Sequence, residues 1–412
     1  MSYDVEALRA HFPSLQSGLA HFDGPGGTQT PREVGEAIAR VLTGPLSNRG
    51  RVGVSEVNAD DAVTAFRAAY ADFLGASPRG VVYGRSATQL TYDFSRHLAK
   101  GWGGGDEVVV SRLDHDANVS PWVQAAAAAG ARVRWIDFDP QTAEVDLGSV
   151  TEAITDRTRV VALTAASNLL GTKPPVRRIA DAAHAAGALV YVDGVHYSAH
   201  QFVDVAELGA DFFVCSPYKF LGPHCAVLAA APELLESLTP DKLEPSTNEV
   251  PERFEFGTLP YEIMAGATAA VEVLAALAPG DATERREQLR SSLHAVDRHE
   301  LRLRQVVEAG LCDLGGEAVL HSRAADRTPT LLVTFPGRRS LDAYHFLAER
   351  KVLAPADWFY AHQASLRLAL DDSHALRIGL APYTSDEDVA RLLEGLADFV
   401  AHSASGGGRA AR

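Results

Sequence analysis

Cysteine is scarce in this sequence, which excludes the protein classes that depend on it. The 412 residues include only three cysteines, Cys215, Cys225 and Cys312, and none of them forms a CxxC pair. A disulfide framework needs a dense, even set of cysteines, and a structural zinc site needs ligands at short, regular spacing. The 15 histidines are scattered without HEXXH spacing, so we expect no metal site.

An excess of positive charge is also absent. Lys and Arg total 38 against 53 Asp and Glu, and the formal net charge is −15. Binding to a phosphate backbone needs clustered Lys and Arg. We therefore expect no nucleic-acid partner, although a local pocket for a small phosphate stays possible.

Long apolar runs are missing as well. No run is long enough to span a bilayer, and residues 1–15 show no basic segment followed by an apolar one. We therefore expect no membrane association and, by default, a cytoplasmic location.

The sequence instead alternates short apolar runs with helical patterns. The runs DEVVVS, VRWIDFD, RVVALTAAS, ALVYVD and DFFVCS lie between residues 106 and 216, separated by segments such as VSPWVQAAAAAG and VRRIADAAHAAG. This alternation is typical of βαβ units, so it predicts an α/β fold with a mainly parallel sheet that helices cover on both faces. Ligands of such sheets bind beyond the carboxyl ends of the strands.

The C-terminal part of the chain predicts a second, smaller α/β unit with an antiparallel sheet. We expect a long helix over 284–310, strands near TPTLLVTFP and SLRLAL, and a final helix over 386–401. The sequence APGD at 278–281 marks a hinge. The expected division is a large domain at 16–280, a small domain formed by 1–15 and 281–402, and a disordered tail at 403–412.

Four polar residues closely follow the apolar runs, where a ligand is expected: His115, Asn168, Asp193 and Lys219. A desolvated lysine amine can form a Schiff base with an aldehyde, and a buried carboxylate can hold a protonated pyridine nitrogen. Asp193 and Lys219 together therefore indicate a cofactor cradle. Taken singly, Asp193 would equally suit the start of a turn, and Lys219 a solvated loop.

Ser86, Ala87 and Thr88 lie at the start of another expected helix. Unpaired N–H groups at a helix N-terminus bind phosphate without any net positive charge. An ordinary capped helix would show the same residues, so both interpretations are open.

Four motifs together carry a family resemblance. DHDANVSPW, SNLLGT, VDGVH and CSPYKFLGP follow one another in the family's order and spacing. From about Phe22 to the final helix, the chain resembles the class V aminotransferase group of pyridoxal phosphate enzymes, and most closely the cysteine desulfurases and selenocysteine lyases. The resemblance implies the aspartate aminotransferase-like fold type I, with a large domain and a smaller C-terminal α/β domain. It also implies pyridoxal 5'-phosphate as cofactor, a small amino-acid substrate, and a homodimer with its active site at the subunit interface.

The resemblance also implies roles for individual residues. Lys219 matches the Schiff-base lysine, and Asp193 matches the partner of the pyridine nitrogen. His115 matches the histidine that lies over the pyridine ring, and Arg377 matches the arginine that binds the substrate carboxylate through its bidentate fork. The other matches hold the cofactor: Asn168 at its phenolic oxygen, Ala87, Thr88, Ser216 and His196 at its phosphate, and Gly257 and Thr258 at the phosphate of the neighbouring subunit.

The chain departs from the desulfurase pattern in ways that bear on the reaction. Desulfurases carry a nucleophilic cysteine upstream of the substrate arginine, but the equivalent stretch here, KVLAPADWFYAHQ, contains none. The three cysteines lie elsewhere and are expected to be structural. Tyr218 stands where desulfurases commonly have histidine, either as an acid–base group or as packing. The loop around Trp358, which includes Asp357, Phe359 and Tyr360, would shape the substrate pocket or only pack.

Without the thiol, β-elimination becomes the expected reaction. The enzyme would be a carbon–sulfur lyase that converts L-cysteine or an S-substituted cysteine to a thiol, pyruvate and ammonia, with Lys219 as general base. Decarboxylation-coupled deamination, transamination, epimerisation and desulfuration without the usual cysteine would start from the same site and stay open. A degenerate fold that only binds ligands is the non-enzymatic alternative, against which the joint presence of the lysine, aspartate, histidine and arginine speaks.

Overall fold

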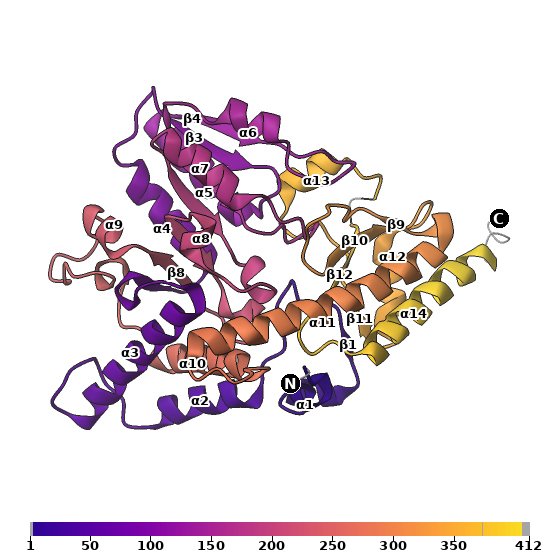
Figure 1. Ribbon diagram of the computed structural model, residues 1–412, viewed down its shortest axis with the longest axis horizontal. Helices are drawn as coiled ribbons and strands as arrows, with labels where there is room; N and C mark the ends of the chain where they lie inside the picture. Colours follow the sequence, from indigo (N-terminus) through magenta and orange to yellow (C-terminus); the bar gives the residue numbers. More distant parts are fainter. Residues whose placement is uncertain (1–2, 373, 406–412) are drawn as a thin grey trace, which may run out of the picture.

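The structure, a computed structural model, describes residues 3–372 and 374–405 and is built around a seven-stranded sheet (Figure 1). The strand order is β2-β8-β7-β6-β5-β3-β4, and β8 runs antiparallel to both of its neighbours. The pairs from β4 through β3, β5 and β6 to β7 are all parallel, so the predicted mainly parallel sheet is confirmed. The strands are β2 Val81–Gly84, β3 Glu107–Ser111, β4 Arg132–Ile136, β5 Thr158–Thr164, β6 Leu189–Asp193, β7 Phe212–Cys215 and β8 Ala226–Ala230.

Helices cover both faces of this sheet because successive strand residues point to opposite sides. On β3, Val109 belongs to one apolar cluster, whereas Val108 and Val110 belong to another. The first cluster is covered by α3 Val54–Leu74, α6 Leu147–Ala153, α7 Val176–Ala185 and α10 Tyr261–Ala276. The second is covered by α4 Ala87–Ala99, α5 Ser120–Ala129 and α9 Pro232–Ser237. Of two further helices, α2 Arg32–Thr43 packs against α10, and α8 Val205–Leu208 packs against α7.

A three-stranded antiparallel sheet of order β12-β10-β9 forms the C-terminal part, as predicted. Helices α12 and α14 and the second half of α11 pack around it with one further apolar cluster. The elements are β9 Val319–Leu320, β10 Thr330–Thr334, β12 Leu376–Gly379, α11 Arg285–Asp313, α12 Ser340–Glu349 and α14 Asp386–Ser405.

The prediction of a strand at SLRLAL is wrong, because most of this segment belongs to helix α13, His362–Leu368. Leu366 is 63% exposed. Ala364 is buried in a separate apolar cluster that also contains Leu332 and Ala375, and Leu368 packs against that cluster. Ala364 and Leu368 are four residues apart and therefore share one helix face. The segment has a helical period that its alternating leucines conceal.

The N-terminal segment contacts both parts of the molecule. It contains α1 Val5–Arg9, the 3₁₀ turn η1 Pro13–Ser17 and strand β1 Ala20–His21, which pairs in parallel with β11 Val352–Leu353. Leu8, Phe12 and Leu15 pack in the cluster of the large sheet, whereas Ala20 and Phe22 pack in the C-terminal cluster. Residues 3–15 thus pack on the large unit and also make polar contacts with the small one, so their assignment to the small domain stays a prediction.

Helix α11 also crosses the expected domain boundary (Figure 1). Its first half contributes Leu289 and Leu293 to the large-sheet cluster, and its second half contributes Leu303 and Val307 to the C-terminal cluster. The division at residue 280 therefore stays a prediction. The tail expected at 403–412 lies mostly outside the described residues.

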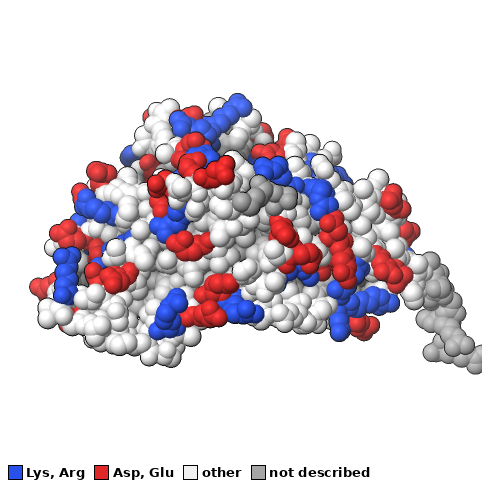
Figure 2. Space-filling model, turned by 60° about the horizontal axis from the view of Figure 1, so that its bottom comes forward, with Lys and Arg blue, Asp and Glu red and all other residues white. Residues whose placement is uncertain are grey.

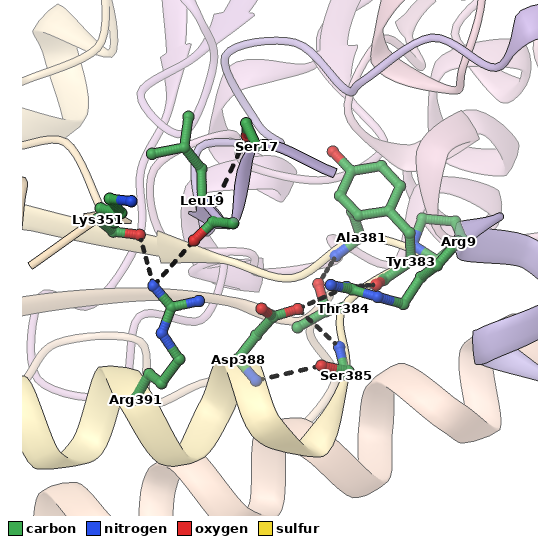
Figure 3. Close-up of polar contacts among 12 residues, drawn as sticks. Arg9, Ser17, Leu19, Lys351, Ala381, Tyr383, Thr384, Ser385, Asp388 and Arg391 are labelled. Atoms are coloured by element: carbon green, nitrogen blue, oxygen red, sulfur yellow. Dashed lines mark hydrogen bonds and ion pairs between the residues drawn. The ribbon is translucent and has the colours of Figure 1, made fainter. Parts of the chain in front are cut away.

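Polar contacts fasten the N-terminal segment to helix α14 (Figure 3). Arg9 donates from Nη1 to Asp388 Oδ2 and to the carbonyl oxygen of Tyr383, both at 2.7 Å. Arg391 on α14 donates to the carbonyl oxygens of Gly18 and Lys351, both at 3.1 Å. These contacts hold the chain that leads into the loop at Gly24–Gly27, which reaches the site described below.

The surface carries charges of both signs. On the face shown in Figure 2, Lys and Arg side chains are interspersed with Asp and Glu and do not gather in one basic area. Within the described residues, no helix has both the length and the apolar character needed to cross a bilayer.

Candidate active site

A cavity of about 600 Å³ lies at the carboxyl ends of β5, β6 and β7, where this topology predicts a ligand. Its size is typical of sites for small ligands and cofactors. A larger hollow of about 1130 Å³ lies between α2, α3 and α10, but none of the predicted site residues lines it. The smaller cavity is lined by ten of the predicted site residues: Ala87, Thr88, His115, Asn168, Asp193, His196, Ser216, Tyr218, Lys219 and Arg377.

Lys219 is placed by the turn that follows β7. The 3₁₀ turn η5, Pro217–Lys219, presents its Nζ to the carbonyl oxygens of Pro25 and Gly26, the latter at 3.1 Å. Burial, and then the positive charge of Arg377, lower the pKa of Lys219 to about 7, although Asp193 acts in the opposite direction. Near neutral pH, a large fraction of this amine is therefore unprotonated and able to act as a nucleophile or base.

Asp193 is the last residue of β6 and is 6% exposed. Its Oδ1 accepts a hydrogen bond from the Val195 N–H at 2.9 Å. Burial raises the pKa of Asp193 to about 6, more than this hydrogen bond and the charge of Lys219 can offset. A buried carboxylate of this kind favours a ligand that brings a positive charge.

His115 precedes the 3₁₀ turn η3, Asp116–Asn118, and its Nδ1 accepts the Ala117 N–H at 3.1 Å. This bond assigns the ring proton to Nε2. Burial, and then the charge of Lys219, lower the pKa of His115 to about 4, so the ring is neutral at pH 7. The ring stacks on Tyr360, with centroids 5.6 Å apart and an interplanar angle of 26°.

Arg377 reaches the cavity from β12 and is 3% exposed. Its Nη1 donates to the carbonyl oxygen of Asn168 at 3.0 Å, and its Cζ lies 3.6 Å from the centroid of the Phe359 ring. Its Nε is buried without a hydrogen-bond partner among the described residues. Burial lowers the pKa of Arg377 to about 9 against the charges of Asp357 and Asp23, so the side chain stays positive at neutral pH. A positioned cation with an unused donor suits a carboxylate ligand.

Asn168 follows β5, lines the cavity and contacts the loop that carries Phe359 and Tyr360. Its Nδ2 donates to the carbonyl oxygen of Phe359 at 2.9 Å, and its Oδ1 is buried without a partner in the described part of the chain. Phe359 and Tyr360 have φ angles of 54° and 56°, in the left-handed region that non-glycine residues seldom adopt. Such strain persists only where the surroundings hold it, and here Asn168 holds the loop against the cavity.

The predicted phosphate residues lie around the start of α4. Ser86 caps this helix by accepting the Gln89 N–H at 3.1 Å, and the N–H groups of the first turn have no acceptor within a helix. His196 is buried, and its Nε2 lies 3.1 Å from the Thr328 hydroxyl and 3.0 Å from the Thr330 hydroxyl. His196 therefore lines the cavity, but one of its ring nitrogens is already engaged.

The structure does not bring every predicted residue to this cavity. Trp358 is 36% exposed and lines a neighbouring hollow of about 350 Å³, whereas Phe359 and Tyr360 line the cavity, so its role toward the substrate stays a prediction. Gly257 and Thr258 are exposed and lie outside the cavity of their own chain. Their contact with a neighbouring subunit stays a prediction.

Two features of the site were missed from the sequence. The carbonyl groups of Pro25 and Gly26 contact Lys219, and the side chain of Asp116 lines the cavity. The glycine-rich loop around Pro25 and the position of Asp116 directly after His115 were the available signals.

The remaining polar and sulfur groups are placed as follows. Tyr218 lines the cavity, its ring centroid lies 4.7 Å from Lys219 Nζ, and burial raises the pKa of its phenol. Cys215 and Cys225 are buried, whereas Cys312 is exposed on α11, which contradicts a packing role for that residue. No three His, Cys, Asp or Glu side chains gather as metal ligands would within 3–372 and 374–405.

The donor set fits pyridoxal 5'-phosphate. Lys219 offers an amine of lowered pKa, Asp193 offers a buried carboxylate, and Asn168 offers an unpartnered polar atom. The capped start of α4 offers N–H groups for a phosphate. These are the groups that an aldehyde, a pyridine nitrogen, a phenolic oxygen and a phosphate require.

Comparisons with known proteins agree with this chemistry. The family model for aminotransferase class-V matches residues 20–392. The chain is 30% identical over 408 residues to an uncharacterized protein of Mycobacterium tuberculosis, covering 97% of this chain and 100% of that protein. It is 29% identical over 407 residues to a probable cysteine desulfurase of Vibrio cholerae, covering 95% and 98% of the two chains. The crystal structure of a cysteine desulfurase from Escherichia coli superposes with a TM-score of 0.86 at 26% identity, covering 98% of this chain and 100% of that chain.

Proposed function

Because the chain belongs to the class V aminotransferase family and is a pyridoxal phosphate-dependent enzyme of fold type I, we propose that it is a carbon–sulfur lyase. The proposed substrate is L-cysteine or an S-substituted cysteine. In the proposed β-elimination, the Cα–H and Cβ–S bonds break, and the sulfur leaves with its bonding pair and takes up a proton. With one water consumed, the products are a thiol, pyruvate and ammonia.

The composition of the loop opposite Arg377 carries this proposal. Residues 351–363 contain no cysteine, and the loop contributes Asp357, Phe359 and Tyr360 to the cavity wall. A desulfurase needs a thiolate that attacks the substrate sulfur and keeps it as a persulfide. Without that thiolate at the site, the sulfur must depart with the rest of its substituent.

Pyridoxal phosphate, when bound, supplies the electron sink that stabilises negative charge at the substrate carbon. We assign Lys219 to its aldehyde carbon, Asp193 to its ring nitrogen and Asn168 to its phenolic oxygen. We assign its phosphate to Ala87, Thr88, Ser216 and His196, with Gly257 and Thr258 reaching the phosphate of the partner in a homodimer.

Arg377 and Lys219 have the main roles toward the substrate in this proposal. Arg377, positive and partly unpaired, binds the substrate carboxylate and so fixes the Cα–H bond relative to the cavity. Lys219, with a pKa of about 7, removes the Cα proton as a general base. His115 is neutral, carries its proton on Nε2 and lines the same cavity as Lys219, so it adds no positive charge there.

Tyr218 is assigned as the acid for the departing sulfur. Burial raises the pKa of its phenol, so the phenol keeps its proton at neutral pH. Its ring centroid lies 4.7 Å from Lys219 Nζ. A group that is protonated at working pH and lies beside the base can donate to a leaving thiolate.

Product identification tests the proposal. The holoenzyme is incubated with L-cysteine and with S-ethyl-L-cysteine, and pyruvate, thiol and alanine are measured by mass spectrometry. We expect pyruvate to equal the released sulfur compound, hydrogen sulfide from L-cysteine and ethanethiol from S-ethyl-L-cysteine, with far less of both from Lys219→Ala. Alanine with a protein-bound persulfide would instead establish a desulfurase, and Cys312→Ser would then show whether the exposed cysteine accepts the sulfur.

A further inference from the structure

Two carboxylates flank the aromatic wall of the cavity without a cationic partner. Asp357 begins the loop that carries Phe359 and Tyr360, and the Asp116 N–H donates to the carbonyl oxygen of Tyr360 at 2.8 Å. Asp116 Oδ2 accepts the Ser120 hydroxyl at 2.8 Å, and Asp357 Oδ1 accepts the Trp358 N–H at 2.8 Å. Within the described residues, neither carboxylate has a Lys, Arg or His nitrogen within 4.0 Å. Neither carboxylate is therefore paired with a cation at this wall.

The other charged groups of the cavity have assigned partners. Arg377 takes the substrate carboxylate, Lys219 the cofactor aldehyde and Asp193 the cofactor ring nitrogen. Asp357 acts on Arg377 over a longer distance and raises the pKa of its guanidinium, an effect that every substrate with a carboxylate shares. Once Arg377 is paired with a carboxylate, Asp116 and Asp357 are left without a cationic partner among the described residues, so the wall that they form with Tyr360 is acidic.

Aromatic rings complete this wall. Tyr360 is 65% exposed, so part of its ring stays accessible although the rings of His115 and Trp358 both lie 5.6 Å from it, centroid to centroid. The Phe359 ring is already covered by the Arg377 guanidinium at 3.6 Å. An accessible aromatic face beside carboxylates is the surrounding that proteins use to bind ammonium groups.

We propose that the β-substituent of the natural substrate carries a positive charge, held between Asp116, Asp357 and the Tyr360 ring. This inference rests on the proposed lyase function. The buried and partly unpaired Arg377 fixes one end of the substrate, and the acidic wall selects the other end. A substituent that ends in a carboxylate is rejected by like-charge repulsion.

The test compares three substrates of the holoenzyme that differ in charge at the end of the substituent. They are S-(2-aminoethyl)-L-cysteine, S-propyl-L-cysteine and S-carboxymethyl-L-cysteine, and pyruvate is followed for each. We expect kcat/KM for the aminoethyl compound to exceed that for the neutral propyl compound by about five- to tenfold, and the carboxymethyl compound to be the poorest. The preference should shrink when the ionic strength is raised from about 0.05 M to about 0.5 M, since screening weakens partly exposed charge pairs.

Variants connect the preference to the two carboxylates. Asp116→Asn and Asp357→Asn should each lower the ratio of kcat/KM for the aminoethyl and propyl compounds, and together they should bring it close to one. The ratio cancels any effect of Asp357 on Arg377, because both substrates carry the same α-carboxylate. Asp313→Asn, an exposed position at the end of α11, removes the same charge elsewhere and should leave the ratio unchanged.

The possible failures are distinguishable. Pyruvate from all three compounds without a preference for the amine, or with a preference for the carboxymethyl compound, would overturn this inference and leave the lyase proposal standing. Pyruvate from none of them would overturn this inference, and only if L-cysteine and S-ethyl-L-cysteine also gave no pyruvate would the lyase proposal fall with it. The salt dependence of the unmodified enzyme decides the matter even where a variant does not fold.

Discussion

Replacement of Asp193 by asparagine should stabilise the cofactor-free protein while it weakens the cofactor site. Asp193 has a folded-state pKa of about 6 against an ordinary value of 3.8, because burial disfavours its charged form. Because the carboxyl pKa is raised in the folded state, the contribution of Asp193 to the free energy of unfolding is fully present below pH 3.8 and is lost as the pH rises through about 6. The difference of about two pKa units corresponds to about 3 kcal/mol of unfolding free energy at pH 7.

Urea unfolding of the cofactor-free protein at several pH values measures this effect. Asparagine keeps the size of the side chain and an oxygen for the Val195 N–H, but it cannot ionise. At pH 7 and above we expect the variant to be more stable than the unmodified protein by up to about 3 kcal/mol, and at about pH 4 we expect the gap to close. Asp156→Asn, at an exposed position, controls for the loss of one negative charge.

The opposite result would refute this reasoning about the buried carboxylate. An Asp193→Asn protein that is less stable at pH 7, or a gap that persists at pH 4, would show that the charged form is not disfavoured by burial. The same variant should bind pyridoxal phosphate more weakly, since a neutral amide cannot pair with a protonated ring nitrogen. Weaker cofactor binding together with a more stable cofactor-free protein is the signature of a residue kept for function.

Other predictions concern the chemistry of the cavity. Lys219→Ala should remove the visible absorbance of the holoenzyme and lower pyruvate formation by about 10²- to 10⁴-fold, measured by spectroscopy and by coupled assay. Reconstitution with cofactor should accelerate as the pH rises through about 7, because the neutral amine of Lys219 is the reactive form. Arg377→Met removes a positive charge and should move the pH midpoint of this acceleration upward. An unchanged midpoint would show that the charge of Arg377 does not lower the pKa of Lys219. Tyr218→Phe should slow substrates with a basic leaving thiol more than those with an acidic one, whereas equal slowing would exclude its role as the acid. Cys312→Ser should leave pyruvate formation unchanged, and loss of activity would point to a thiol-dependent reaction.

Much of the fold could be predicted because the strands of the large sheet are apolar on both faces. Runs such as that of β6 end at a polar residue, and in a parallel sheet all such ends meet at one edge. That is why Asp193, Asn168 and Lys219 could be placed together without a structure. The helix that replaced the strand expected at SLRLAL shows where this signal fails, since a single turn with alternating leucines suits both periods.

The details that decide chemistry were beyond the sequence because they depend on long-range contacts. Phe359 and Tyr360, rather than Trp358, line the cavity, and both have left-handed backbone angles. Asn168 and Asp116, from a distant part of the chain, hold this loop through hydrogen bonds to its carbonyl groups. The contact of His196 with Thr328 likewise joins a segment that follows β6 to one that precedes β10. No local pattern encodes such pairs.

In the proposed reaction, sulfur leaves this enzyme as hydrogen sulfide or a free thiol and not as a persulfide on the protein. Mass spectrometry of the products and of the intact protein after turnover of L-cysteine and S-ethyl-L-cysteine tests it most directly. We expect pyruvate in an amount equal to the hydrogen sulfide or ethanethiol released, no alanine and an unmodified protein mass. Alanine together with a protein heavier by a sulfur atom would contradict it.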